Sequence, residues 1–280
     1  MASPMAINTN TGSLNVQRNL MKSGRMLNSS ISRLSSGLKI NSAADDAAGV
    51  AVSEGLSAQV RGFKQGLENA NDANAILATA EGAYNSISDI LIRMRELAVQ
   101  ASNDSLTGTE RGYINTEFTQ LATEITRISD VAEFNGIKLL DGTGGDGSGN
   151  FVFQVGTRNT VNDRIGIALG DTDAAALGVD SLTTDTLANS QTSISTIDTA
   201  LQTLATSRAT LGSTQNQLTA AVDNLAVTIE NLSSANSQIK DADVAAESAD
   251  FTKNQVLMQA GTAMLSQANG LPQLALRLLG

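Results

Sequence analysis

The chain has 280 residues, a mass of 28.9 kDa and a formal net charge of −10, and it contains no Cys, His or Trp. The lack of Cys and His excludes disulfides, thiolate and imidazole metal sites, and Ser-His-Asp or Cys-His catalysis. The acidic balance argues against a nucleic-acid partner. Carboxylates and Lys remain, so catalysis is not excluded by composition, but most enzyme mechanisms are. Because the sequence contains no catalytic constellation either, we expect no enzyme, metal or cofactor.

The acidic residues are confined to the middle of the sequence. Residues 1–44 and 251–280 contain bases but no Asp or Glu, so all 28 acids lie between them. Because both ends of the chain are basic and free of acids, we expect them to lie together in the fold. The first residues lack the apolar run of a cleavable signal peptide, and the apolar run at 271–279 is too short for a bilayer. If the protein leaves the cell, we expect a route that cleaves nothing, and we expect no membrane insertion.

Helical spacing of apolar residues is thin near the N-terminus and dense beyond residue 56. One amphipathic face lies within 20–38, and a longer pattern from 56 to 94 predicts a long helix. A break at 103–109 follows, with Thr109 as the expected cap of a second helix that has apolar residues at 114, 118, 121, 125 and 128. Asp45–Asp46, Asp241 and Asp243 are interpreted as helix caps rather than as catalytic carboxylates.

One region of the chain has a β pattern. A Gly-rich loop at 141–149 precedes two short apolar segments, 151–155 and 164–169, which predict a hairpin. The glycine spacing in this loop matches a dinucleotide fingerprint in letters, but it precedes a strand instead of following one, so we expect no phosphate site. Residues 170–190, rich in Thr, Asp and Ala, are expected to form a surface connection.

The strongest helical pattern runs from 194 to 239 with a strict 3.5-residue period, which predicts one long helix in a left-handed coiled coil. Polar residues at 208, 215 and 236 weaken the apolar seam but fix its register. A last, thin amphipathic pattern covers 251–268. The seam consists of Ile197, Leu204, Leu211, Leu218, Leu225, Leu232 and Ile239.

These patterns predict a mainly α fold: a long antiparallel α-helical coiled-coil bundle with a small β-hairpin region at about 141–190 and helical termini. Residues 1–44 with 241–280 are expected to form a terminal helical domain. Residues 45–240 are expected to form a core domain of three long helices. The terminal segments have too few apolar residues to be stable alone, so they are expected to pair with each other, to pack on neighbouring subunits, or to stay disordered in the monomer.

Several motifs resemble bacterial flagellin over about residues 5–142 and 190–280. They are Arg33–Gly49, Arg93–Ser102, Glu133–Gly142, Arg208–Leu218 and Gln259–Asn269. Only about fifty residues lie where the longer members have their variable outer domains, so the chain is similar to a short flagellin without them.

The resemblance implies a structural subunit that is exported unfolded and polymerises into the extracellular flagellar filament for swimming motility. The terminal helices would form an inner tube. The implied partners are other copies of the chain in a helical homopolymer, an export chaperone, the export apparatus, and the filament cap and hook-associated proteins. The alternative is a flagellar hook–filament junction protein, which has the same terminal architecture.

The segment 93–100 has two interpretations. It is either a coiled-coil face for subunit contacts, with Met94 and Leu97 inward, or a contact for the Toll-like receptors by which hosts sense flagellin. The receptor interpretation rests on the resemblance, because Arg93, Leu97 and Glu117 match the family's contact positions. Ile92 departs from the Gln that recognised relatives commonly have at its position.

Overall fold

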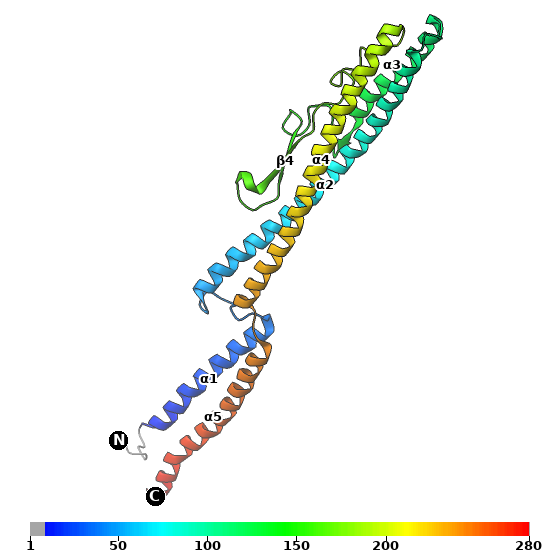
Figure 1. Ribbon diagram of the computed structural model, residues 1–280. Coiled ribbons are helices and arrows are strands. Elements are labelled where there is room, and N and C mark those ends of the chain that lie inside the picture. The colour runs from blue at the N-terminus through cyan, green and yellow to red at the C-terminus, as the bar shows by residue number, and fades with distance from the viewer. Residues whose placement is uncertain (1–8, 280) are drawn as a thin grey trace. The chain divides into compact units, whose positions relative to one another are not determined.

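The computed structural model describes the backbone of residues 9–279 and the side chains of residues 9–270 (Figure 1). The chain forms two compact units, one made of residues 1–58 with 231–280 and the other of residues 59–230. The mainly α fold class is confirmed. The helices are α1 (Thr11–Ser36), α2 (Ala47–Ala101), α3 (Gly108–Val131), α4 (Leu187–Lys240) and α5 (Val244–Leu279).

The unit of residues 59–230 is built on α2, α3 and α4. Helices α2 and α4 run antiparallel, as two side-chain contacts show: Arg95 Nε donates to Asp198 Oδ1 at 2.7 Å, and Gln215 Nε2 donates to Glu81 Oε2 at 3.3 Å. Its core is aliphatic with few aromatic side chains. Burial raises the pKa of Tyr84 to about 12. The largest buried side chains include Leu77, Tyr84, Ile87, Leu91, Met94, Phe118, Ile125, Ile197, Leu204 and Leu218.

Helix α3 returns antiparallel to α2 after a short turn. Its N-cap is Thr107, whose Oγ1 accepts from the Glu110 backbone N–H at 3.3 Å, while the Glu110 carboxylate accepts from the Thr107 N–H at 2.7 Å. This capping box corrects the expectation that Thr109 caps the helix. The sequence does contain the capping-box pattern, since Thr-x-x-Glu occurs at 107–110.

Two small antiparallel ribbons follow α3. The first pairs β1 (Glu133–Phe134) with β2 (Ile137–Lys138) around Asn135 and Gly136, whose φ angles are 50° and 77°. The second is the predicted hairpin, which is confirmed: β3 (Asn150–Gln154) pairs with β4 (Arg164–Ala168), with Asn150 opposite Ala168. A 3₁₀ turn, η1 (Val161–Asp163), leads into β4.

The segment between the hairpin and α4 is not a surface connection, contrary to the sequence-based expectation. It contributes to the core of its unit and is hydrogen-bonded to α3. The Ala174 N–H donates to Thr126 Oγ1 at 3.4 Å, and the Thr184 N–H donates to Asn115 Oδ1 at 2.7 Å. Its buried residues are Thr172, Ala174, Leu177, Val179 and Thr184.

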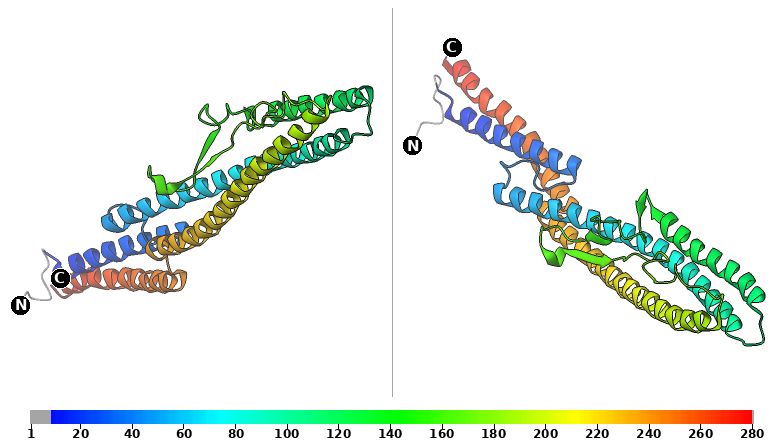
Figure 2. Two further views of the ribbon diagram at one scale, coloured as in Figure 1. Left: turned by 45° about the horizontal axis from the view of Figure 1, so that its top comes forward. Right: turned by 90° about the horizontal axis from the view of Figure 1, so that it is seen from above.

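In the other unit, α1 and α5 pack antiparallel side by side in every view (Figures 1 and 2). The two connections next to them form a short main-chain ladder, in which the Lys39 N–H donates to the Lys240 carbonyl at 2.7 Å and the Ala242 N–H to the Gly37 carbonyl at 2.9 Å. Gly37 ends α1 with φ of 72°, a conformation that favours glycine. The termini therefore pair with each other, one of the three outcomes expected for them.

Two of the four aspartates interpreted as caps do cap helices. Asp46 Oδ1 accepts from the Gly49 N–H at the start of α2, and Asp243 Oδ1 accepts from the Ala245 and Ala246 N–H groups at the start of α5. Asp45 instead accepts hydrogen bonds from the Ser42 hydroxyl, the Ser42 N–H and the Asn41 N–H, which hold its pKa below the ordinary value. Asp241 accepts from Ser237 Oγ. These last two stabilise the connections between helices.

Candidate assembly and contact surfaces

The predicted seam of α4 lies in the interior along most of its length. Ile197, Leu204, Leu211 and Leu218 are almost completely buried and Leu225 nearly so, whereas Leu232 and Ile239 are partly exposed. Polar residues of the repeat form specific contacts: Gln215 with Glu81, and Asn236, whose Nδ2 donates to Ser57 Oγ at 3.2 Å. Arg208 is exposed. The seam is thus an intramolecular surface, with polar contacts that specify one register.

The second candidate surface lies across α2 and α3. Arg93 Nε and Nη2 both donate to Glu117 Oε1, at 3.0 and 2.9 Å, and Nη1 donates to Glu96 Oε2 at 3.1 Å. These hydrogen bonds, first those that Glu117 accepts and then that to Glu96, raise the pKa of Arg93. The Arg93 and Glu117 side chains are 49% and 48% exposed. The fold therefore brings Arg93 and Glu117 together at the surface.

Leu97 does not share that surface. Its side chain is 2% exposed and belongs to the core cluster with Met94, so it offers no apolar contact to a partner of the free chain. Exposed apolar groups on these two helices include Ile92 and Val99 on α2 and Tyr113 on α3. Sequence reasoning missed Val99 and Tyr113, although both fall outside the inward helical period.

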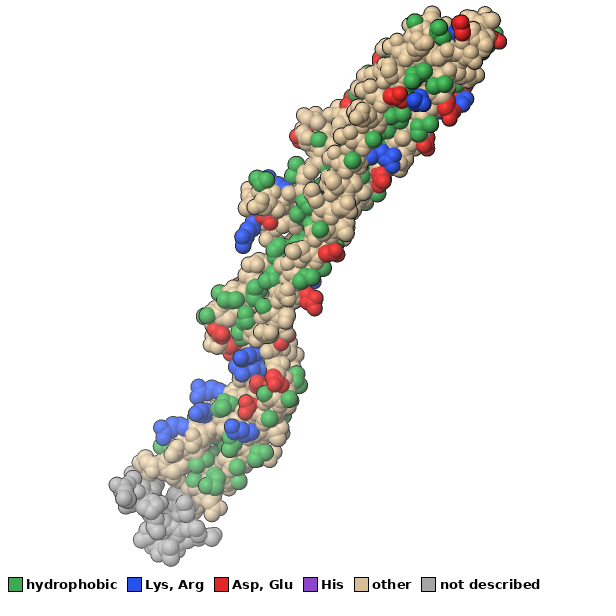
Figure 3. All heavy atoms as spheres, viewed as in Figure 1, with side chains coloured by type: hydrophobic (Ala, Val, Ile, Leu, Met, Phe, Trp, Pro, Cys, Tyr) green, Lys and Arg blue, Asp and Glu red, His purple; other side chains and the backbone are tan. Residues whose placement is uncertain are grey.

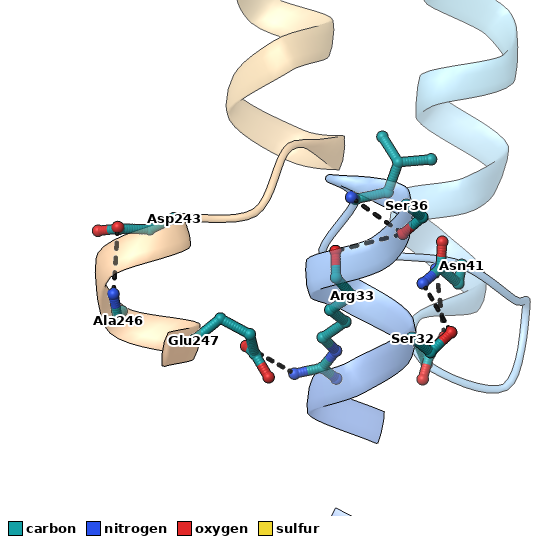
Figure 4. Close-up of polar contacts among 9 residues, drawn as sticks. Ser32, Arg33, Ser36, Asn41, Asp243, Ala246 and Glu247 are labelled. Atoms are coloured by element: carbon teal, nitrogen blue, oxygen red, sulfur yellow. Dashed lines mark hydrogen bonds and ion pairs between the residues drawn. The ribbon is translucent and has the colours of Figure 1, made fainter. Parts of the chain in front are cut away.

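The third candidate surface is the pair of terminal helices. Among its described residues, α1 buries only Ser13 and Ser30, so its apolar face is poorly covered. Figure 4 shows the end of the pair at which α1 ends and α5 begins, where Arg33 Nη1 lies 3.7 Å from Glu247 Oε2. Large apolar side chains are also exposed along the two helices: Leu14, Met21, Met26, Ile31, Val256, Leu257 and Met264. Apolar side chains exposed in this number leave the pair available for contacts with other molecules.

No group of three or more Asp and Glu side chains gathers into a possible ion site within the described residues. Over the same part of the chain, each helix is either too short or too polar to cross a bilayer. The surfaces available are helical faces, which suit contacts with other macromolecules.

Comparison with known proteins finds flagellins along both halves of the chain. The model of the bacterial flagellin N-terminal helical region matches residues 7–144, and that of the C-terminal helical region matches residues 194–279. A flagellin of Halalkalibacterium halodurans is 41% identical, aligning over 98% of this chain and 100% of its own length. The flagellin FlaB2 of Treponema pallidum is 38% identical with the same coverage. Because these relatives align over their whole length, the chain is a short flagellin.

A solved structure described as a flagellar hook-associated protein from Vibrio parahaemolyticus also superimposes. Its TM-score is 0.57 at 16% identity, covering 70% of this chain and 100% of that one, which shows a shared fold alone. The end-to-end identity to flagellins favours the filament subunit over the junction protein. With both family regions matched, the chain belongs to the bacterial flagellins, the structural subunits of the extracellular flagellar filament that drives motility.

Proposed function

We propose that residues 1–44 and 241–280 are the polymerisation domain of this flagellin and that residues 45–240 are a folded core domain. The observation that supports this division is the number of large apolar side chains left exposed along α1 and α5, since α1 buries only Ser13 and Ser30. The core, in contrast, buries its seam within one chain. Terminal helices of neighbouring subunits would cover one another and form the inner tube.

The composition also fits export in an unfolded state through the flagellar export apparatus. Before export, a chaperone would bind the chain. The chain has no Cys, so no disulfide can block passage through a narrow channel. The cap and hook-associated proteins are the further partners that the family implies, and they would meet the same terminal helices at the filament ends.

A fragment of residues 45–240 is expected to remain a folded, helical monomer and to fail in seeded polymerisation. The fragment keeps the whole of α2 and α4, and therefore the buried seam, while it lacks α1 and α5. Circular dichroism, gel filtration and electron microscopy after seeding measure the two properties. The control is the full-length variant Val161→Ser, which removes an exposed apolar side chain outside the terminal helices. This variant should polymerise like wild type. Filaments grown from the fragment would contradict the division.

A second proposed contact is with a flagellin-sensing Toll-like receptor, through the exposed Arg93–Glu117 pair. The planar guanidinium of Arg93 has five N–H donors, and residues of this kind dominate many interfaces. Leu97 would act beneath this surface through packing, and Ile92 would supply the exposed apolar group.

Arg93→Ala is expected to reduce receptor activation by monomers about tenfold or more. Glu117→Ala should reduce it by less, because a solvent-exposed ion pair between Glu117 and Arg93 contributes little energy. A reporter-cell assay with monomer and with crosslinked filament measures the response. Arg127→Ala, which breaks the exposed Arg127–Glu124 pair on α3, is the matched control and should change nothing. Equal potency of wild type and Arg93→Ala would refute the receptor contact and leave the filament role intact.

A further inference from the structure

The described methionines of the chain fall into two groups by burial. Met21 and Met26 on α1 and Met264 on α5 are 62%, 45% and 60% exposed, and Met258 on α5 is half-buried. Met94, the one methionine of the core domain, is completely buried. Figure 3 shows hydrophobic side chains, in green, at the surface of the terminal helix pair. The exposed thioethers among the described residues therefore lie on the two terminal helices.

The exposed methionines lie on more than one side of this helix pair. Met26 and Met264 line an open groove of about 530 Å³ between α1 and α5, and Met21 does not line it. Five residues turn an α-helix by about 140°, so Met21 and Met26 point to different sides of α1. A molecule that packs along either side therefore meets a thioether.

Methionine is the side chain of this protein that a peroxide oxidises most readily, because the chain has no Cys, His or Trp. A lone pair of the thioether sulfur attacks one oxygen of hydrogen peroxide. A sulfur–oxygen bond forms, the oxygen–oxygen bond breaks, and the second oxygen leaves as water with both hydrogens. The sulfur loses two electrons, which the peroxide gains. The sulfoxide that results is polar, whereas the thioether is apolar.

We propose that Met21, Met26 and Met264 form a reversible oxidation site through which hydrogen peroxide stops the free monomer from assembling. A subunit contact that covers these side chains must remove water from each sulfoxide, and burial of a polar group without a hydrogen-bond partner is unfavourable. Methionine sulfoxide reductases reverse the change, with one enzyme for each sulfoxide epimer. The site would therefore couple assembly to the peroxide level around the monomer.

The effect on assembly rests on the proposed polymerisation domain, whereas the place of oxidation rests only on the exposure of the three side chains. In a filament, neighbouring subunits would cover the same methionines. Peroxide should therefore act before assembly, and the three sulfurs should be protected in the polymer.

Treatment of the full-length monomer with hydrogen peroxide, followed by peptide mass spectrometry and seeded polymerisation, tests the proposal. We expect sulfoxide at Met21, Met26 and Met264, slower oxidation at Met258 and little at Met94. The elongation rate should fall about tenfold or more relative to untreated monomer. Incubation with both methionine sulfoxide reductases should restore it. Preformed filaments exposed to the same peroxide should keep the three methionines unmodified.

The triple variant Met21→Leu/Met26→Leu/Met264→Leu removes the three sulfurs and keeps the side chains apolar and of similar volume. Its ratio of treated to untreated elongation rate should stay near one. The control Met94→Leu keeps the exposed sulfurs and should lose elongation as wild type does.

Normal elongation of wild type with all three sulfoxides present would overturn the proposal. A loss that the reductases do not reverse, or one as large in the triple variant, would place the sensitive group elsewhere and would also overturn it. Oxidation of Met94 as fast as that of Met21 would remove its basis in exposure. Filaments grown from the 45–240 fragment would contradict the polymerisation domain instead. Normal elongation of oxidised monomer beside an inert fragment would refute the oxidation site alone.

Discussion

Replacing Leu218 with Asp is expected to destabilise the core by about 4 kcal/mol or more and to lower its melting temperature sharply. Leu218 is completely buried in the middle of the α4 seam. The change removes a large apolar side chain from a packed core and puts an ionisable group into it. Burial would raise the pKa of the new carboxyl, so the loss should be largest at neutral pH and smaller near pH 4, where the group is neutral. Circular dichroism melts at both pH values measure the effect.

Gln217→Asp is the matched control for this prediction. It introduces the same side chain one residue away, on the exposed side of α4. Its effect on the free energy of unfolding should stay within about 0.5 kcal/mol. If the melting curve of Leu218→Asp matched that of Gln217→Asp, the seam would not be the core contact of α4.

The long helices could be predicted because their signal is local and repeated. The 3.5-residue period at 194–239 gave α4, which the structure extends to Leu187–Lys240, and the same argument gave α2 and α3. Leu232 and Ile239 fit the period as well as Leu218 does, yet they are only partly buried. A period shows which face is apolar, whereas burial also depends on whether another element covers that face.

The segment before α4 shows where such reasoning ends. Ala174, Leu177 and Val179 follow neither a helical nor a strand period, and Thr and Asp surround them, so their burial has no local signature. The segment is held by hydrogen bonds that the Ala174 and Thr184 N–H groups donate to Thr126 and Asn115 on α3. Those partners lie about fifty to seventy residues away in sequence, and only the assembled fold brings them close.

The candidate contact site was predictable to the same extent. The resemblance selected Arg93, Leu97 and Glu117; the structure pairs Arg93 with Glu117 but leaves Leu97 off their surface. Periodicity placed Leu97 inward with Met94, and the structure buries it there. The neighbouring Arg95–Asp198 ion pair at 2.7 Å was beyond prediction, because it depends on the register between α2 and α4.

Gly66→Ala is expected to destabilise the chain and to loosen the β3–β4 hairpin. A Cβ on Gly66 would lie 2.2 Å from the Val155 carbonyl oxygen, a backbone contact that cannot be relieved by rotating a side chain. The hairpin is held at this point by Asn69, whose Nδ2 donates to the Gln154 carbonyl at 2.9 Å. Alanine favours a helix over glycine by up to about 1 kcal/mol. The strain of overpacking, about 1–3 kcal/mol, opposes and exceeds that gain.

Gly82→Ala separates these two effects within the same helix. Gly82 is exposed and a Cβ there would meet no atom within 4 Å, so this variant should gain the helical preference and melt at a higher temperature. Gly66→Ala should melt lower and should be cut faster by trypsin at Arg158, which lies in the exposed connection between β3 and β4. Opposite shifts from one chemical change would locate the strain at the contact of α2 with the hairpin. Equal increases in melting temperature, with unchanged cleavage at Arg158, would show that the hairpin does not press on α2 at Gly66.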